Sequence, residues 1–280
     1  MTSDFPDHEW KSVLFGTTPN VVIGQRLGIS YVRSQQEQLT INVREQVITV
    51  SQSTMGLTAI PGVVWDAALL MIDYLVYEYR QERQLFLNKV LDLGCGTGVI
   101  GIAACLLGAN YVLFSDGYSS SSILEENIAS SLPEELQSKT KFVSHKWENE
   151  ELPSELLRNN GIFKLCSDPA ENSVYGCNVS ESSDHLARQL SVWDTIICSD
   201  LFYDEKMLPP LLSTLRKLSF RRLLIGYKKR HDEPEEKFFM ALSEWCSLSI
   251  VPIESIELIN CSPSAARSEL YIIIAVPYCT

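Results

Sequence analysis

Residues 90–101 read VLDLGCGTGVIG, a short apolar run followed by three closely spaced glycines and a second apolar run. The first run predicts a buried strand, and the second predicts a helix that ends at Gly108. Glycines in such a turn let backbone N–H groups approach a ligand at the N-terminus of the helix. The stretch therefore predicts a strand–turn–helix unit of an α/β fold that binds a ligand.

The glycines fit two known turns, which hold different ligands. Residues 96–101 fit G-x-G-x-x-G, the turn of dinucleotide-binding folds. Residues 94–98, two positions after Asp92, fit the turn that holds S-adenosylmethionine. A carboxylate inside a buried strand is unfavourable unless a cationic or hydrogen-bonding group meets it. The amino end of a methionine moiety provides such a group and NAD does not, so Asp92 favours S-adenosylmethionine.

The chain from residue 89 onward alternates strand-like and helix-like segments. Strand patterns occur at KVLDL, YVLFSD, KFVSHKW, WDTIICSD and RRLLIGYKK. The last helix is expected from Glu233 to about Cys246. Two β-like runs follow, SLSIVPIESIELI and ELYIIIAVP, with no room between residues 259 and 270 for a crossover helix, so these strands should pair antiparallel. The expected fold class is α/β, a doubly wound, mostly parallel, seven-stranded Rossmann-like sheet that ends in an antiparallel hairpin.

Two segments lie outside this alternation. Residues 1–60 are expected to form an N-terminal extension with short antiparallel strands near Ile29 and Tyr31, at 39–43 and at 47–50. The main domain is expected at 61–280, with a first helix over 64–77. Within it, residues 148–192 are polar, acidic and longer than a normal crossover. They predict a solvated insertion with one short helix near 153–159, in preference to a partner-binding element.

Composition limits the partners of the protein. The net charge of −12 argues against broad electrostatic binding to nucleic acid, which needs a basic face. It suits a basic protein partner, although acidity also serves solubility. The eight cysteines form no C-x-x-C pair and the four histidines share no ligand spacing, so buried thiols and no metal are expected. With no visible secretory signal and no membrane-length apolar run, we expect the protein in the cytoplasm, with the nucleus as a second compartment. We also expect a monomer.

Four segments in order resemble the seven-β-strand methyltransferases that use S-adenosylmethionine, and among them the protein lysine methyltransferases with a D-x-x-Y motif. They are GVVWDAALLMIDYL, VLDLGCGTGVIGI, SDGYSSSSILEENI and SDLFYDEKMLPPLL, and LLIGYKKR is also typical of this family. The resemblance runs from about residue 62 to the C-terminus. It departs after Asp116, where the family usually has an apolar residue and a proline and this chain has Gly117, Tyr118 and four serines.

The resemblance and the strand ends together give a set of candidate cofactor-binding residues. Asp116 ends the second strand, where an acid meets the ribose hydroxyls of a nucleoside. Trp147 ends the third strand, where it could contact an adenine or simply pack in the core. The full set of expected cofactor contacts is Trp65, Asp92, Gly94, Gly96, Gly98, Asp116, Trp147 and Ser199.

The D-x-x-Y motif gives the candidate catalytic residues Asp200 and Tyr203. Methyl transfer is an in-line displacement that depends on positioning. The Asp200 carboxylate would hold the acceptor amine and direct its lone pair toward the methyl group, and Tyr203 would complete a collar around it. The structural alternatives are that Asp200 caps the helix starting near Glu205 and that Tyr203 is a packing residue.

The function that the sequence predicts is methyl transfer from S-adenosylmethionine to a lysine side chain of another protein. The first alternative keeps the cofactor but changes the acceptor to a histidine, an N-terminal amine or a small molecule. The second is a cofactor-binding scaffold without turnover. An NAD-dependent oxidoreductase is a more distant alternative.

Overall fold

The computed structural model describes residues 9–15, 33, 35–53, 62–81, 87–117, 122–157, 192–267 and 269–278. The strand expected near Ile29 and Tyr31 lies outside these residues, as does most of the polar insertion expected at 148–192.

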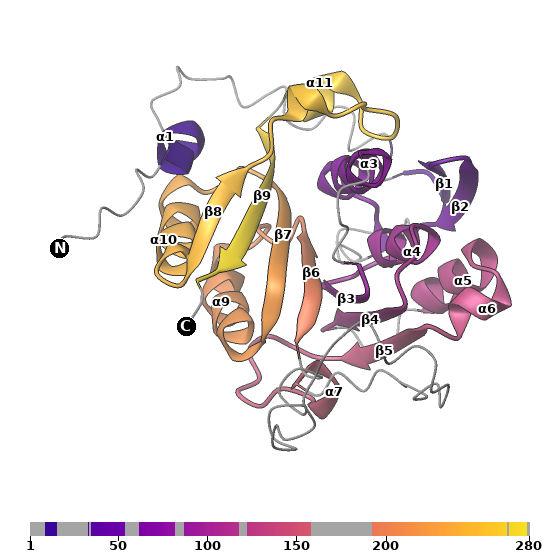
Figure 1. Ribbon diagram of the computed structural model, residues 1–280, viewed down its shortest axis with the longest axis horizontal. Coiled ribbons are helices and arrows are strands. Elements are labelled where there is room, and N and C mark those ends of the chain that lie inside the picture. Colours follow the sequence, from indigo (N-terminus) through magenta and orange to yellow (C-terminus); the bar gives the residue numbers. More distant parts are fainter. Residues whose placement is uncertain are drawn as a thin grey trace, which may run out of the picture.

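The described residues form a seven-stranded sheet in the order β5-β4-β3-β6-β7-β9-β8 (Figure 1). The strands are β3 (Lys89–Leu93), β4 (Tyr111–Asp116), β5 (Thr140–Ser144), β6 (Trp193–Ser199), β7 (Phe220–Lys228), β8 (Cys246–Ile250) and β9 (Leu270–Pro277). Strands β3 to β7 are parallel, and β9 pairs antiparallel with both β7 and β8. The chain order reverses between β3 and β6, and ligands of open α/β sheets bind outside the carboxyl ends of strands at such a point. The expected fold class is confirmed.

Helices cover both faces of the sheet (Figure 1). One face carries α3 (Asp66–Arg80) and α4 (Val99–Leu106), and the other carries α9 (Leu208–Lys217) and α10 (Asp232–Ser243) with α1 (Glu9–Phe15) beside it. The remaining short elements are α5 (Ser122–Ser131), α6 (Glu134–Gln137), α7 (Ser154–Leu157), η3 (Glu205–Met207), η4 (Ile253–Ser255) and α11 (Pro263–Ala266). Side chains of β3 alternate between the two layers, with Val90 in the α3–α4 core and Leu91 and Leu93 in the α9–α10 core. None of the described helices combines the length and apolarity needed to cross a bilayer.

An N-terminal hairpin packs against the first of these layers. It consists of β1 (Gln38–Val43) and β2 (Gln46–Ser51), so the strands expected at 39–43 and 47–50 are confirmed. Its buried side chains, including Ile41 and Val50, belong to the same core as α3 and α4. Fully buried Asn127 of α5 fastens the hairpin: its amide accepts from the Ser51 N–H (2.7 Å) and donates to the carbonyls of Ser51 and Thr97 (3.1 Å each).

The structure corrects two expected boundaries near the C-terminus. The helix expected to reach Cys246 ends at Ser243, because Cys246 begins β8. The β-like run 247–259 is strand only to Ile250. Pro252 has no N–H to offer a strand ladder. Farther along, the Asp73 carboxylate of α3 accepts the backbone N–H groups of residues 259–261 at 2.9–3.1 Å, which holds that segment as a loop.

Candidate functional site

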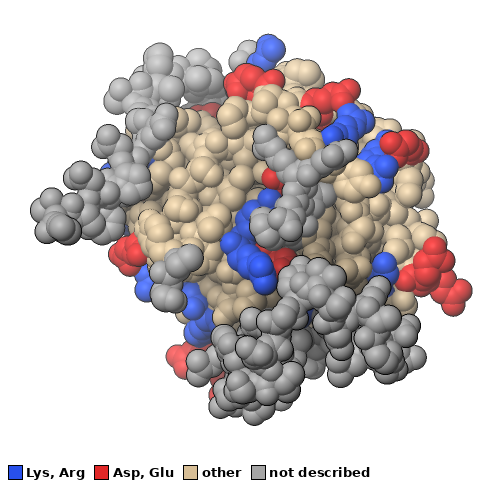
Figure 2. Space-filling model, viewed as in Figure 1, with Lys and Arg blue, Asp and Glu red and all other residues tan. Residues whose placement is uncertain are grey.

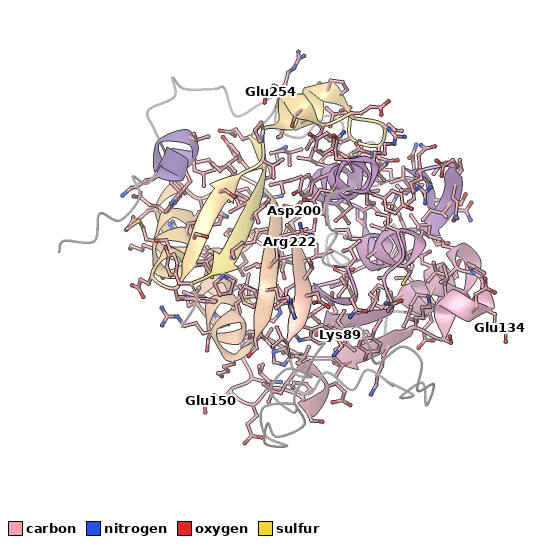
Figure 3. All side chains as sticks on the ribbon, in the orientation of Figure 1. Lys89, Glu134, Glu150, Asp200, Arg222 and Glu254 are labelled. Atoms are coloured by element: carbon pink, nitrogen blue, oxygen red, sulfur yellow. The ribbon has the colours of Figure 1, made fainter. Side chains whose placement is uncertain are left out.

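A cavity of about 630 Å³ opens at the carboxyl ends of the central parallel strands. Nine of the ten expected site residues line it: Trp65, Asp92, Gly94, Gly96, Asp116, Trp147, Ser199, Asp200 and Tyr203. Figure 3 shows Asp200 at this end of the sheet, whereas Lys89, the first residue of β3, lies toward the other end. The fold therefore gathers residues from five separate segments of the chain around one cavity.

The glycine turn forms one wall of the cavity, and larger residues would not fit in it. Gly94 has a positive φ of 72°, and a Cβ at this position would lie 2.5 Å from Leu201 Cδ2 and 3.2 Å from the Trp147 ring. Gly98 is the residue of the expected set that is not among the lining residues. It is the N-cap of α4 with φ 77°, and Leu124 occupies the space that its side chain would need. Gly98 thus shapes the turn, and a direct cofactor contact by Gly98 stays a prediction.

Asp92 is the buried acid of the cavity, with only 2% of its surface exposed. Its Oδ2 accepts the backbone N–H of Gly101 in α4 at 2.9 Å. Burial raises the pKa of Asp92 to about 7, and the negative charge of Asp116 also raises it, although the Gly101 hydrogen bond acts in the opposite direction. A cation bound in the cavity would stabilise the ionised form of Asp92.

Three further lining residues contribute polar and aromatic groups. Asp116 Oδ2 accepts the N–H of Gly96 at 2.9 Å, which holds the carboxylate against the glycine turn. Trp147 lies beyond the end of β5 at Ser144, so it does not end the strand as expected. It is 9% exposed and both lines the cavity and belongs to the core, so the two roles considered for it are compatible. The buried Ser199 hydroxyl has no hydrogen-bond partner among the described residues.

These groups fit S-adenosylmethionine. The ligand carries a cationic amine and a sulfonium, two ribose hydroxyls and an adenine. Asp92 would interact with the cationic methionine end, and Asp116 would accept hydrogen bonds from the ribose hydroxyls. The indoles of Trp65 and Trp147 offer apolar surface to the adenine. The unpartnered Ser199 hydroxyl leaves one polar group that a ligand can satisfy.

The D-x-x-Y segment forms another part of the wall, next to the glycine turn at Leu201. Asp200 has a left-handed backbone with φ 54° and donates its N–H to the Gly226 carbonyl at 2.7 Å, and 8% of the residue is exposed. It does not cap the following helix, because the N-cap of η3 is Asp204, whose carboxylate accepts from the Lys206 N–H. The alternative role of Asp200 as a helix cap is therefore wrong. Tyr203 is 37% exposed at the mouth of the cavity, which does not fit a core packing role.

Phe202, between the two motif residues, anchors this segment in the core. Its ring is fully buried and packs against Tyr227 and Phe239, with centroids 4.9 and 5.4 Å away. Because Phe202 is fixed in the core, Asp200 and Tyr203 are held at the cavity.

Sequence reasoning missed Arg230. Its guanidinium forms a two-point ion pair with Asp200, with Nη1–Oδ1 at 2.6 Å and Nη2–Oδ2 at 3.1 Å. A signal was present, since Arg230 ends the basic run that follows β7, and adjacent parallel strands β6 and β7 end at the same edge of the sheet.

Comparison with known proteins gives one family for this chain. A sequence model of the lysine methyltransferase family matches residues 42–168 and 180–245. The Xenopus tropicalis protein N-lysine methyltransferase METTL21A is 27% identical over 179 residues, which cover 62% of this chain and 65% of that protein. Mouse EEF1A lysine methyltransferase 3 is 24% identical over 199 residues, covering 70% and 67% respectively. Bovine histidine protein methyltransferase 1 homolog is 29% identical over 157 residues, covering 55% and 39%. The chain thus matches about two thirds or less of the length of these relatives. Because the family model covers more than half of the residues, the chain belongs to the lysine methyltransferase family.

Proposed function

We propose that this protein transfers a methyl group from S-adenosylmethionine to a lysine side chain of a protein. The observation that carries the proposal is the shared cavity, which is lined both by the acids and glycines suited to the cofactor and by Asp200 and Tyr203. The cofactor supplies an electrophilic methyl group on sulfur. The residues of this chain need to bind it, to orient the acceptor and to allow the acceptor to lose a proton.

Asp200 is the group that orients the acceptor. A carboxylate has about four lone-pair sites, of which the Arg230 fork uses two, so capacity remains to accept N–H bonds from an amine. The Tyr203 ring would flank the acceptor. Tyr203 is exposed at the mouth of the cavity, so an acceptor beside it is near solvent, which can take the released proton. The reaction then depends mainly on holding the amine in line with the methyl group.

The target protein is a separate question. One relative is named for lysine methylation of EEF1A and another for methylation of a histidine in a protein, which argues against carrying either target over to this chain. The net charge of −12 supports a basic substrate, and we propose a monomer that acts in the cytoplasm, with the nucleus as a second compartment. A histidine acceptor is the second candidate, favoured by the bovine histidine methyltransferase among the relatives.

The test is label transfer from radioactive S-adenosylmethionine into a heat-treated cell extract, with the intact protein, Asp200→Ala and Tyr203→Phe. Discrete labelled protein bands are expected with the intact protein. Asp200→Ala should lower the rate by about 100-fold or more, as loss of a positioned polar group at a reacting centre does. Cofactor affinity, measured by calorimetry, should be similar in all three proteins. Cofactor binding without labelling of any protein would overturn the proposal in favour of a scaffold or a small-molecule enzyme.

A further inference from the structure

We propose that Arg230 is a positioning residue of the acceptor site, which fixes the Asp200 carboxylate and neutralises its charge so that the site receives an uncharged amine. This inference rests on the proposed function and assigns a role to a residue outside the D-x-x-Y motif.

The first support is the geometry of the pair. Each terminal guanidinium nitrogen donates to its own carboxylate oxygen, and Nη1 also donates to the Lys228 carbonyl at 3.0 Å. The Asp200 side chain is 6% exposed and that of Arg230 is 28% exposed, so the pair is largely shielded from water. A two-point fork fixes the plane of the carboxylate, which a single contact does not.

The second support is the way the Arg230 backbone is held. The N–H groups of Arg230 and His231 both donate to Oε1 of Glu235, at 2.9 Å each. Glu235 is fully buried at the start of α10. An arginine that merely filled the site until a substrate displaced it would not need its backbone to be held in this way. The contacts indicate a permanent part of the site.

The third support is electrostatic. A lone carboxylate would favour the protonated form of a lysine side chain, which has no lone pair for the methyl group. Paired with Arg230, Asp200 adds no net charge, yet it can still accept an N–H bond from the neutral amine. Arg230 therefore favours the reactive form of the acceptor.

Other charged and titratable groups surround the site and remain the same in every variant compared. They are Asp92 of β3, Asp116 of β4, His145, Lys146 and Glu148 after β5, Tyr203 and Asp204 before η3, His231 next to Arg230 and Glu235 of α10 behind it. A difference in pH dependence between position-230 variants consequently reports the charge at that position.

The experiment compares Arg230→Met, Arg230→Lys and the intact protein, using labelled S-adenosylmethionine and the most strongly labelled band of the heat-treated extract. Initial rates are measured from neutral to alkaline pH, together with cofactor affinity. Arg230→Met should lower the rate roughly 10- to 100-fold, the effect of a small misplacement at a reacting centre. It should also shift the rise of rate with pH to higher pH. Arg230→Lys keeps the charge but loses the fork, so its rate should fall without that shift.

Lys229→Met is the matched control, because Lys229 contacts Asp232 and the Leu14 carbonyl instead of Asp200. It should keep the rate and pH profile of the intact protein, and cofactor affinity should be equal in all variants. An Arg230→Met protein with the intact rate and profile would overturn the inference and leave the proposed function standing. If Arg230→Met fails to fold, an Arg230→Lys rate equal to the intact rate overturns it instead. An intact protein that labels nothing would remove the proposed function itself.

Discussion

At the scale of single residues, the buried Asp92 makes the stability of the cofactor-free protein depend on pH. Its pKa is about 7 in the folded protein against 3.8 for the ordinary group. The folded state therefore binds a proton more tightly than the unfolded state, and stability falls as pH rises from about 4 to about 7. The loss should amount to a few kcal/mol, since each pKa unit corresponds to about 1.4 kcal/mol. Urea denaturation of the cofactor-free protein across this range measures it.

The variant Asp92→Asn separates the pH dependence due to Asp92 from that due to other buried acids. Burial also raises the pKa values of Asp73 and Glu235. Asparagine can still accept the Gly101 N–H but cannot ionise. The variant should gain stability over the intact protein at alkaline pH and little at acidic pH. An equal difference at both ends would show that Asp92 does not ionise in this range.

Gly98 and Gly108 form a second residue-scale test, because both have a positive φ but only one has a crowded side. A Cβ at Gly98 would lie 2.2 Å from Leu124 Cδ1, whereas nothing lies within 4 Å of one at Gly108. Gly108→Ala should cost only backbone strain, about 1–2 kcal/mol. Gly98→Ala should cost a further 1–3 kcal/mol or so from overpacking and should weaken cofactor binding. Equal denaturation midpoints would contradict the close packing of this turn.

At the scale of elements, Asn127 connects the N-terminal hairpin to the cofactor turn. Its amide bonds Ser51 of β2 on one side and the Thr97 carbonyl on the other. Asn127→Ala leaves these groups unpaired and should destabilise the protein by about 2–4 kcal/mol, with a loss of cofactor affinity. Glu126→Ala is the control, since Glu126 contacts the Ser51 hydroxyl at an exposed position and should change stability by less than about 1 kcal/mol. Similar losses for both variants would contradict a special role for Asn127.

At the scale of elements, the sequence predicted the sheet and most of the candidate site but not every contact between distant segments. Strand–helix alternation predicted the sheet, and the family resemblance together with the strand-end acids gave ten candidate site residues, of which nine line one cavity. The run 247–259 was apolar enough for a strand, but its end is held as a loop by Asp73, which is more than 180 positions away in sequence. Arg230 was missed for a related reason, since its partner Asp200 lies on a neighbouring strand end. Contacts of this kind depend on the completed sheet.

At the scale of the whole molecule, α1 is connected to the acceptor site through the core. Trp10 packs on Phe239 at 6.3 Å, and Phe239 stacks on Phe202 inside the D-x-x-Y segment. Helix α1 lies beside α10, the helix that carries Phe239 (Figure 1). Trp10→Ala should therefore lower the methyl-transfer rate more than the cofactor affinity, because Cys95, Val99 and Ile100 at the cofactor turn pack in the other layer. A variant with lower cofactor affinity and an intact rate at saturating cofactor would contradict this connection.

The charge of the whole molecule also bears on the substrate. On the face shown in Figure 2, acidic and basic side chains are interspersed and no broad basic area is visible among the described residues. With a net charge of −12, attraction of a basic target should be screened by salt. Label transfer should therefore slow as ionic strength rises, with cofactor affinity much less affected. A rate that is independent of salt would argue against a basic target.

The central claim, methyl transfer to lysine, is tested most directly by identifying the methylated amino acid. Proteins labelled by the intact enzyme would be hydrolysed in acid, and the radioactive amino acids separated by chromatography against methyl-lysine and methyl-histidine standards. We predict that the label coelutes with Nε-methylated lysine and is absent with Asp200→Ala. Label that coelutes with methyl-histidine, or that is independent of Asp200, would contradict the assignment of lysine as the acceptor and Asp200 as the group that holds it.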